Sequence, residues 1–211
     1  MSLTYHQKSL EILGVKPKIS QSQVALICSF EERYALRLPA ALREWYSLEN
    51  GFELLQEISA FHVPLEINNM PSIQKDYSDI FSVYEPLPIL VENQWVWHMA
   101  VRLQEGENPP VYIRYNEPNE NWVLHANSFT EWIHALSWDY VSFSKLSFAA
   151  MNERIISVTP ETHERLFGFQ VVAPETYVGN VYFKGEKLVR MRKNDINFLV
   201  IYRNTVVQFN N

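Results

Sequence analysis

Apolar residues recur at helical spacing through the first quarter of the chain, and at alternating or short-run spacing in most of the remainder. In Ser2–Leu13, residues Leu3, His6 and Leu10 fall on one stripe of a helix, and Gly14 follows where a helix-ending glycine is common. The pattern therefore predicts a first helix over residues 2–13.

A second helix is predicted over Gln21–Tyr34. Ser20 and Gln23 have the spacing of a capping box, and Ile19 can pack on Val24 across the helix start. The predicted buried face consists of Val24, Ile27, Cys28 and Tyr34. Since a lone cysteine on a helix usually packs as a small apolar side chain, we expect Cys28 to lie in the core.

The segment Leu36–Phe52 predicts a short third helix. Pro39 suits a first helical turn, and Asn50-Gly51 is typical of a helix end with Gly51 in the left-handed conformation. Leu42, Trp45 and Tyr46 share one face of this helix.

After Gly51 the pattern changes to short runs interrupted by prolines, which predicts strands and turns. Trp95–Val101 alternates, with Trp95, Trp97 and Met99 facing one way. Val111–Tyr115 and Trp122–His125 are further predicted strands.

A further helix is expected after these strands, because Ser128 and Glu131 form a second capping box ahead of Phe129 and Trp132. From Ile155 onward the chain again favours strands. The predicted ones are Leu166–Ala173, Val178–Lys184, Lys187–Arg192, Asn197–Arg203 and Val206–Phe209.

Gly185-Glu186 and Asn194-Asp195 are natural hairpin turns, so the last strands are expected to form an antiparallel meander. The predicted class is α+β, with N-terminal helices packed on a largely antiparallel sheet and a C-terminal β-meander extension. We expect one domain over residues 1–138 and a β-rich extension over 139–211, which either extends the first sheet or packs beside it as an annex.

Composition is that of a folded globular protein, with 211 residues of which 47% are hydrophobic. The N-terminus shows no apolar run behind its charges, and no segment approaches the ~20 uninterrupted apolar residues of a membrane span. A cytoplasmic location is therefore expected.

Charge is distributed unevenly along the chain. Residues 1–138 carry a net charge of −8 and residues 139–211 one of +2, giving the overall −6. An acidic region from Glu44 to Glu120 contains only Lys75, Arg102 and Arg114 as basic residues. Such a surface repels nucleic acid and attracts basic proteins, although acidic surfaces also serve solubility alone.

Motifs for catalysis are missing from the sequence. Six glycines form neither a dinucleotide-binding nor a P-loop pattern, and the six histidines show no HExxH arrangement. The glutamates of Glu161-Thr162-His163-Glu164 flank a histidine, but the spacing matches no zinc pattern. We expect a protein that is not an enzyme and that uses no cofactor or metal.

One basic cluster lies near the C-terminus, interleaved with Tyr182 and Phe183. Its members are Lys184, Lys187, Arg190, Arg192 and Lys193. Aromatic residues beside cations can hold single-stranded nucleic acid. We favour the interpretation that this cluster forms the exposed face of a hairpin. A third interpretation is that its cations keep an outer sheet edge from pairing with another strand.

Several short motifs occur in a particular order. They are Phe30-Glu31, the Leu-Pro helix that ends in Asn50-Gly51-Phe52, Pro110-Val111-Tyr112, Trp122, and Ser128-Phe129-Thr130-Glu131-Trp132. Together they span Gln21 to Leu136 and resemble the Smi1/Knr4 family, also called the SUKH superfamily. The resemblance implies N-terminal helices ahead of a largely antiparallel sheet.

The resemblance also implies a function. Proteins of this kind are mostly non-catalytic binders, and many bacterial members are immunity proteins for toxins, often nucleases. The expected partner is a basic toxin domain, bound by acidic residues with aromatic anchors. The candidate contact residues are Glu53, Glu57, Glu105, Glu107, Glu117, Glu120, Trp95 and Trp97.

A second function remains open from the same resemblance, since fungal members imply a regulatory or scaffold protein in signalling or cell-wall control. That alternative predicts several partners bound with modest affinity. Nucleic-acid binding through the Lys184 to Lys193 cluster is the third interpretation.

Overall fold

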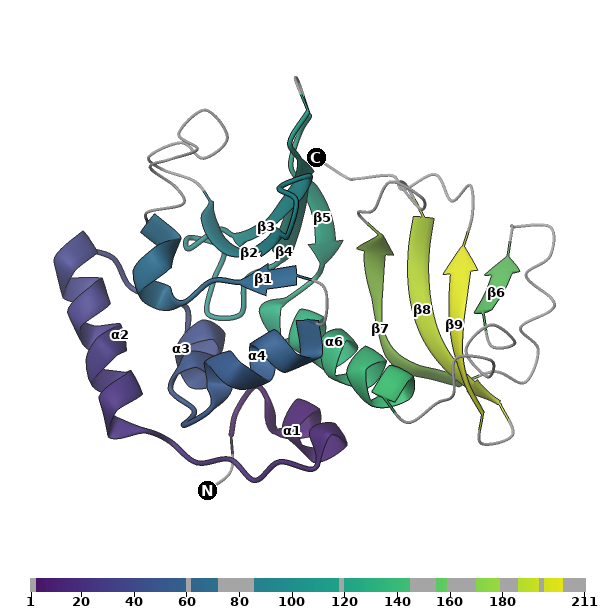
Figure 1. The fold of residues 1–211 in the computed structure, drawn as a ribbon, viewed down its shortest axis with the longest axis horizontal. Helices are drawn as coiled ribbons and strands as arrows, with labels where there is room; N and C mark the ends of the chain where they lie inside the picture. Colours follow the sequence, from purple (N-terminus) through teal and green to yellow (C-terminus); the bar gives the residue numbers. More distant parts are fainter. Residues whose placement is uncertain are drawn as a thin grey trace.

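A computed structural model of the chain describes residues 3–59, 62–71, 86–117, 120–144, 155–158, 170–178, 186–193 and 196–202. For the strands after residue 154 it describes the course of the backbone. Figure 1 shows two parts, a helical and sheet-containing part formed by the first two thirds of the chain and a smaller sheet formed by the last third.

Helices dominate the N-terminal part, and one longer helix follows the first sheet. They are α1 (Gln7–Leu13), α2 (Gln21–Tyr34), α3 (Ala40–Tyr46), α4 (Gly51–Ser59), the 3-10 turn η1 (Ile67–Asn69) and α6 (Phe129–Ser144). The strands of the first sheet are β1 (His62–Pro64), β2 (Leu87–Glu92), β3 (Trp97–Val101), β4 (Val111–Tyr115) and β5 (Val123–Ala126).

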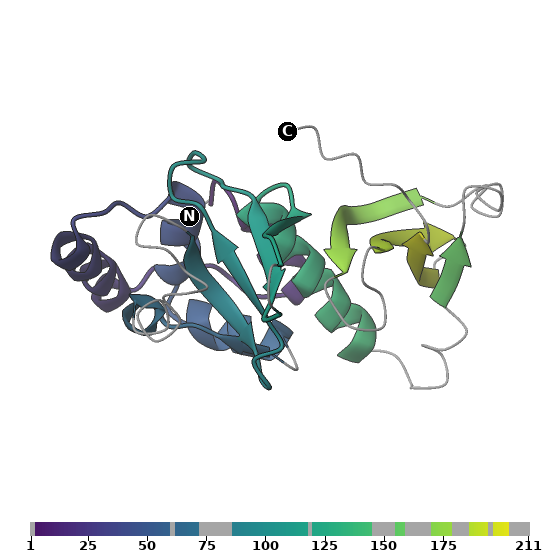
Figure 2. The same cartoon turned by 90° about the horizontal axis from the view of Figure 1, so that it is seen from above.

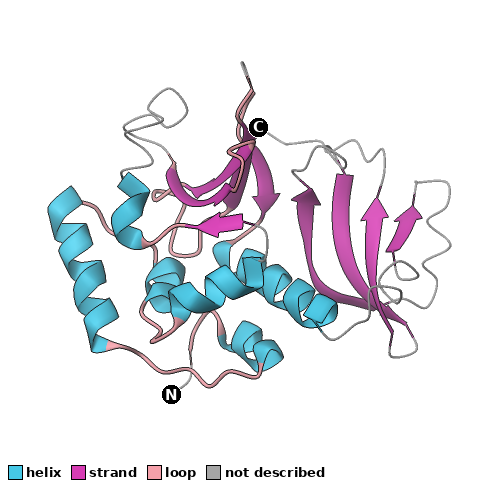
Figure 3. Ribbon diagram, viewed as in Figure 1, coloured by secondary structure: helices cyan, strands magenta, loops and turns pink. Residues whose placement is uncertain are grey.

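The first sheet is antiparallel throughout, with its five strands in the order β1-β2-β3-β4-β5. Its two faces differ. On one face Met99 pairs with Ile113, and Val101 with Val111, and all four side chains are buried. On the other face Tyr112 and Arg114 are half-buried. Helices lie along one side of this sheet (Figure 3), which is the two-layer arrangement of an α+β domain.

The core between helices and sheet contains Phe30, Leu38, Trp45, Phe129 and Trp132, each at most 2% exposed. Burial of one leucine or phenylalanine of this kind contributes roughly 1.5–3 kcal/mol before its entropy cost. The aromatic helix residues thus account for a large share of the core.

Local capping signals in the sequence are confirmed. Gly14 ends α1 in the left-handed conformation at φ 73°. The Ser20 hydroxyl accepts a hydrogen bond from the Gln23 backbone N–H at 3.4 Å, and the Ser128 hydroxyl accepts one from Glu131 at 3.1 Å. These bonds satisfy N–H groups that a helix start leaves without partners.

The predicted end of the third helix is wrong. α3 ends at Tyr46, and Gly51 begins α4 where strands were expected. Gly51 does not have a positive φ. It is required instead because a Cβ there would lie 2.2 Å from the Trp45 carbonyl oxygen. The glycine therefore permits a close approach between α3 and the start of α4.

The predicted buried face of α2 is also partly wrong. Ile27 is buried, with Phe30 beside it, but Cys28 is exposed and Tyr34 is 40% exposed. A narrow stripe is sufficient here because α2 packs mainly against α3 and η1 among the described elements.

Residues ahead of α1 are attached to α3. The Glu44 carboxylate accepts hydrogen bonds from the backbone N–H groups of Thr4, Tyr5 and His6 at 2.7, 2.8 and 2.9 Å. The fully buried His6 ring donates through Nε2 to the Ala41 carbonyl oxygen at 2.8 Å. This segment is thus part of the domain.

The last third of the chain forms a second sheet of four strands, ordered β6-β9-β8-β7. Its strands are β6 (Ile155–Val158), β7 (Gln170–Val178), β8 (Glu186–Lys193) and β9 (Ile196–Tyr202). β7, β8 and β9 form the expected antiparallel meander, and β6 pairs parallel to β9. The predicted strands Val178–Lys184 and Val206–Phe209 lie largely or wholly outside the described residues, as do both predicted hairpin turns at 185 and 194–195.

The second sheet does not extend the first. β7 lies against α6 and β5 without joining the sheet that β5 closes. Seen from above, α6 lies between the two sheets (Figure 2). The α+β class and the C-terminal meander are therefore confirmed.

Candidate protein-binding surface

The candidate contact residues occupy three separate places. Glu53 and Glu57 are exposed on α4. Glu105 and Glu107 lie in the connection from β3 to β4, and Glu117 follows β4. Because the β3–β4 connection and the β4–β5 connection lie at opposite ends of a five-residue strand, they are ~17 Å apart along the sheet. The six glutamates therefore do not form one continuous patch.

Glu105 and Glu107 make contacts inside the fold. The Glu105 carboxylate accepts a hydrogen bond from the Tyr112 hydroxyl at 2.7 Å and pairs with Arg102 at 3.2 Å. Arg102 also lies over the Tyr112 ring, 4.6 Å from its centroid. The Glu107 carboxylate accepts a hydrogen bond from the backbone N–H of Ala40. Both residues thus hold the β3–β4 connection in place.

Trp95, Glu117 and Glu120 lie at the other end of the sheet. The Asn116 N–H donates to the Val96 carbonyl oxygen at 2.8 Å, which joins the β2–β3 and β4–β5 connections. Trp95 adopts a positive φ of 62° in its turn, and its ring lies 5.6 Å from that of His98. Trp95 is half-buried, so part of its ring is accessible at this end of the sheet.

Trp97 has a different position from Trp95. It lies on β3, is 6% exposed, and its ring contacts the His62 ring edge-on at 4.7 Å. Glu120 is half-buried, and its carbonyl oxygen accepts a hydrogen bond from Arg114 Nε at 2.9 Å. Glu117 is exposed. Trp97 thus belongs to the core, whereas Trp95 and Glu117 are available at the surface.

A groove beside Glu53 is a concave surface lined by both acidic and apolar side chains. Helices α2 and α4 form its walls and η1 closes it; we call it the α2–α4 groove. It has a volume of about 460 Å³, part of it open to solvent. Its lining residues are Gln23, Leu26, Tyr46, Phe52, Glu53, Glu66 and Ile67.

The floor of the α2–α4 groove is fixed by the core. Tyr46 is 4% exposed, and its hydroxyl donates to the Leu65 carbonyl oxygen at 3.0 Å. Burial raises the pKa of Tyr46 far above its usual value, so this hydroxyl stays protonated. Ile67 is 2% exposed, whereas Leu26 and Phe52 are half-buried and present apolar surface.

Sequence reasoning identified Glu53 but missed Glu66, Phe52 and Leu26 as neighbours of it. The pattern Glu53-Leu54-Leu55-Gln56 could be assigned to a helix, and a helix over 51–59 would have placed Phe52 beside Glu53. No local signal places Glu66 in the same groove as Glu53, because the groove is formed by segments from α2, α3, α4 and η1 that meet only in the folded chain.

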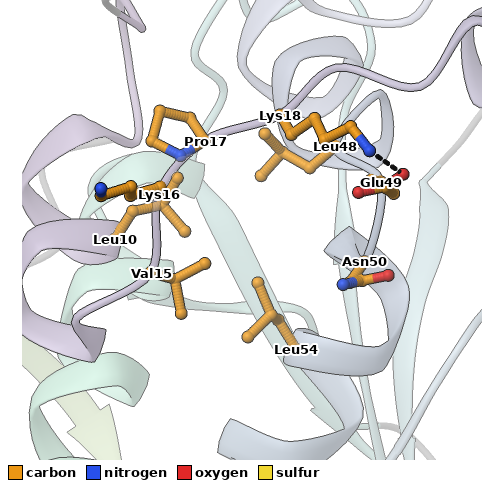
Figure 4. A pocket seen from close by; sticks show the side chains of 9 residues that line it. All are labelled: Leu10, Val15, Lys16, Pro17, Lys18, Leu48, Glu49, Asn50 and Leu54. Carbon is orange, nitrogen blue, oxygen red and sulfur yellow. Dashed lines mark hydrogen bonds and ion pairs between the residues drawn. The ribbon is translucent and has the colours of Figure 1, made fainter.

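Figure 4 shows a second hollow, of about 280 Å³, between the α1–α2 connection and the α3–α4 connection. An ion pair between Lys18 Nζ and Glu49 Oε1 at 2.5 Å crosses its rim. Both side chains are strongly exposed, so this pair contributes at most about 1 kcal/mol. The rim carboxylate of this hollow already has a cationic partner.

Two histidines of the described part, His6 and His98, are fully buried. Burial lowers the pKa of His6 to about 4, and the hydrogen bond to Ala41 only partly offsets this. Burial also lowers the pKa of His98 to about 4, with the positive charge of Arg114 as a lesser cause. Both imidazoles are therefore neutral near pH 7. Within the described ranges, no three His, Cys, Asp or Glu side chains are grouped so that they could hold a metal ion.

The basic cluster lies on β8, apart from Lys184, which falls outside the described residues. β8 pairs with β9 on one side and β7 on the other, so it is not an outer edge. The suggestion that these cations protect a sheet edge is therefore wrong. Among the described residues, no helix is both long and apolar enough to cross a membrane.

Comparison with known proteins gives one positive result. The family model described as the SMI1 / KNR4 family (SUKH-1) matches residues 24–135, more than half of the chain. The matched range runs from α2 to α6 and includes the whole five-stranded sheet and every residue that lines the α2–α4 groove except Gln23. No curated protein and no solved structure matches the chain.

Proposed function

Because this chain belongs to the SMI1 / KNR4 (SUKH-1) family, we propose that it is a non-catalytic protein-binding module that acts as an immunity protein against a basic, nuclease-type toxin. The family match is the observation that carries this proposal. The acidic excess of residues 1–138 supports it, since an acidic surface complements a toxin whose own surface must bind nucleic acid.

The mechanism is direct occlusion. Acidic side chains accelerate encounter with a basic substrate surface, and apolar contacts slow dissociation once the surfaces meet. Bound in this way, the protein excludes nucleic acid from the toxin without any chemical step. The histidines support this proposal because His6 and His98 are neutral and buried, and neither lines the α2–α4 groove.

Internal contacts separate the candidate residues, since Glu105 and Glu107 are exposed as well. Glu57 is exposed but accepts a hydrogen bond from Tyr140. Glu53 and Glu117 are exposed, Trp95 is half-buried, and all three can meet a partner. Glu105 and Glu107 already hold the β3–β4 connection, and Trp97 lies in the core. We therefore assign partner binding first to Glu53, Glu117 and Trp95.

Co-expression tests the proposal in cells. Any nuclease-type toxin domain that a neighbouring gene encodes is induced alone, with this protein, and with a destabilised variant such as Gly51→Val as a control. Survival only with the wild-type protein supports the immunity role. Equal killing in all three cultures contradicts it and favours the scaffold function, for which capture of several partners from native lysate is the next experiment.

A further inference from the structure

The α2–α4 groove combines an apolar floor with two glutamates among its lining residues. Leu26 comes from α2, Phe52 from α4 and Ile67 from η1, so three elements supply the apolar surface. Glu53 on α4 and Glu66 beside η1 supply the charge, and both are exposed. No lysine or arginine is among the residues that line this groove.

Glu53 and Glu66 differ from most acidic residues of the described part, because no described side chain or backbone group pairs with their carboxylates. Most of the others are engaged. Glutamates with a hydrogen bond or ion pair inside the protein include Glu11, Glu31, Glu44, Glu49, Glu57, Glu92, Glu105 and Glu107. Two carboxylates that share one groove thus remain for an external cation.

The groove is formed before any partner binds. Tyr46 and Ile67 are almost fully buried in its floor, and the Tyr46 hydroxyl is hydrogen-bonded to Leu65. A fixed floor lowers the ordering cost of binding, because few groove side chains need to be immobilised. Only the exposed glutamates and the half-buried Leu26 and Phe52 need to adjust.

We propose that the α2–α4 groove binds a lysine- or arginine-bearing amphipathic segment of the protein partner, with the cationic head between Glu53 and Glu66. The apolar part of that segment lies on Leu26, Phe52 and Ile67. Long cationic side chains are suited to this, since their methylene stems pack on apolar surface while the charge reaches the rim. This inference deepens the proposed protein-binding function and rests on it.

Charge complementarity favours a cationic segment in this groove over nucleic acid, anionic lipid, an acidic peptide or a purely apolar peptide. Nucleic acid and anionic lipid would place negative charge against Glu53 and Glu66, at a site lined by no cation. An acidic peptide is disfavoured for the same reason. A purely apolar peptide would leave the two carboxylates without partners at a newly buried rim, which costs free energy.

A peptide titration tests the groove without the toxin. The probe is a fluorescent 14-residue helical peptide with leucine on one face and lysine on the other, and the comparison peptide has glutamate in place of lysine. Wild-type protein should bind the lysine peptide and not the glutamate peptide. The double variant E53K/E66K should weaken binding by about tenfold or more, as expected for reversing two contacting charges.

A matched variant distinguishes binding in the groove from a general effect of the protein's net charge. Glu11 and Glu32 are exposed, neither is among the candidate contact residues, and neither lines the α2–α4 groove. E11K/E32K therefore changes the net charge equally and should weaken peptide binding less than about threefold, through long-range electrostatics alone. A Leu26→Gln variant should also weaken binding, because it removes apolar floor.

Three outcomes overturn the groove assignment. They are no binding of the lysine peptide, equal binding of the glutamate peptide, and equal loss in the two double variants. Circular dichroism of each variant shows that the fold is retained, as expected for exposed positions. Since the toxin is not used, a negative result here leaves the survival experiment to judge the immunity role separately.

Discussion

The Glu107 carboxylate accepts a hydrogen bond from the backbone N–H of Ala40 at 2.8 Å, across 67 positions of sequence. The Glu107 carbonyl oxygen also accepts a hydrogen bond from the N–H of Ala41 at 2.9 Å. α3 has Pro39 at its N-cap position, and proline has no side-chain acceptor. The β3–β4 connection therefore caps the N-terminus of α3, because the local sequence provides no side chain that could do so.

Replacing Glu107 with Ala should destabilise the protein by about 1 kcal/mol, the usual cost of losing a helix cap. Chemical denaturation followed by tryptophan fluorescence measures this free energy of unfolding. Glu117→Ala is the matched control and should change stability by less than about 0.5 kcal/mol, because Glu117 is exposed. Equal stability of the two variants would show that the cap contributes nothing.

Replacing Gly51 with Ala should cost about 3 kcal/mol, at the upper range for overpacking, since the new Cβ would lie 2.2 Å from the Trp45 carbonyl oxygen. Gly106 provides the comparison. Its φ is +95°, but nothing lies within 4 Å of an added Cβ, so Gly106→Ala should cost only about 1 kcal/mol. The two melting temperatures rank these effects, and a smaller loss for Gly51→Ala than for Gly106→Ala would contradict the close approach.

Replacing Glu31 with Ala should destabilise the protein by about 2–3 kcal/mol, because the carboxylate serves two groups. It accepts a hydrogen bond from the Leu38 backbone N–H at 2.8 Å and pairs with Arg43. The hydrogen bond to Glu31 raises the pKa of Arg43 above its usual value. Glu31→Gln keeps an acceptor for Leu38 and should cost about half as much.

The exposed Lys18–Glu49 pair is the control for that series. Glu49→Ala should cost at most about 1 kcal/mol, because an exposed ion pair is well solvated on both sides. Urea denaturation of the three variants provides the comparison. If Glu49→Ala proved as costly as Glu31→Ala, the half-buried position of the Glu31 carboxylate would not be the reason for its effect.

Stability should fall with acid because His6 is buried in its neutral form. Its pKa is about 4 in the folded protein and 6.5 when unfolded, so the unfolded state binds more protons between these values. The contribution is complete above about pH 6.5 and is lost as the pH falls toward 4, by about 3 kcal/mol in total. Unfolding free energies measured from pH 7 to pH 4 give this slope.

His6→Gln tests the origin of the slope. Glutamine can donate to the Ala41 carbonyl oxygen but does not titrate, so the variant should be less stable at pH 7 and show a shallower decline between pH 6.5 and pH 4. His98, whose pKa is also about 4, continues to contribute in this variant. An unchanged slope would assign the pH dependence to groups other than His6.

Features that depend on neighbouring residues were predictable from sequence. The start of α2 and the start of α6 were predicted correctly because Ser20 and Ser128 cap within three residues. Gly14 ends α1 for an equally local reason, since its conformation suits glycine. The alternating pattern likewise placed β4 at its observed bounds.

Features that depend on distant contacts were not predictable. Gly51 carries the signature of a helix end, but its reason is the Trp45 carbonyl oxygen, which only the folded chain brings near. β2 was not recognised because Pro86 and Pro88 resemble strand breakers, and the ladder accommodates Pro88 beside an irregularity of register. The presence of Glu53 and Glu66 in one groove is of the same kind.

A titration of purified toxin measures occlusion itself. Increasing amounts of this protein are added to a fixed amount of the toxin domain used for co-expression, well above the dissociation constant, and the remaining nuclease activity is recorded. A linear decline that reaches zero at one molecule per toxin is the expected result, with E53K/E66K inhibiting less than E11K/E32K. Full toxin activity at a severalfold excess of this protein would contradict an immunity function.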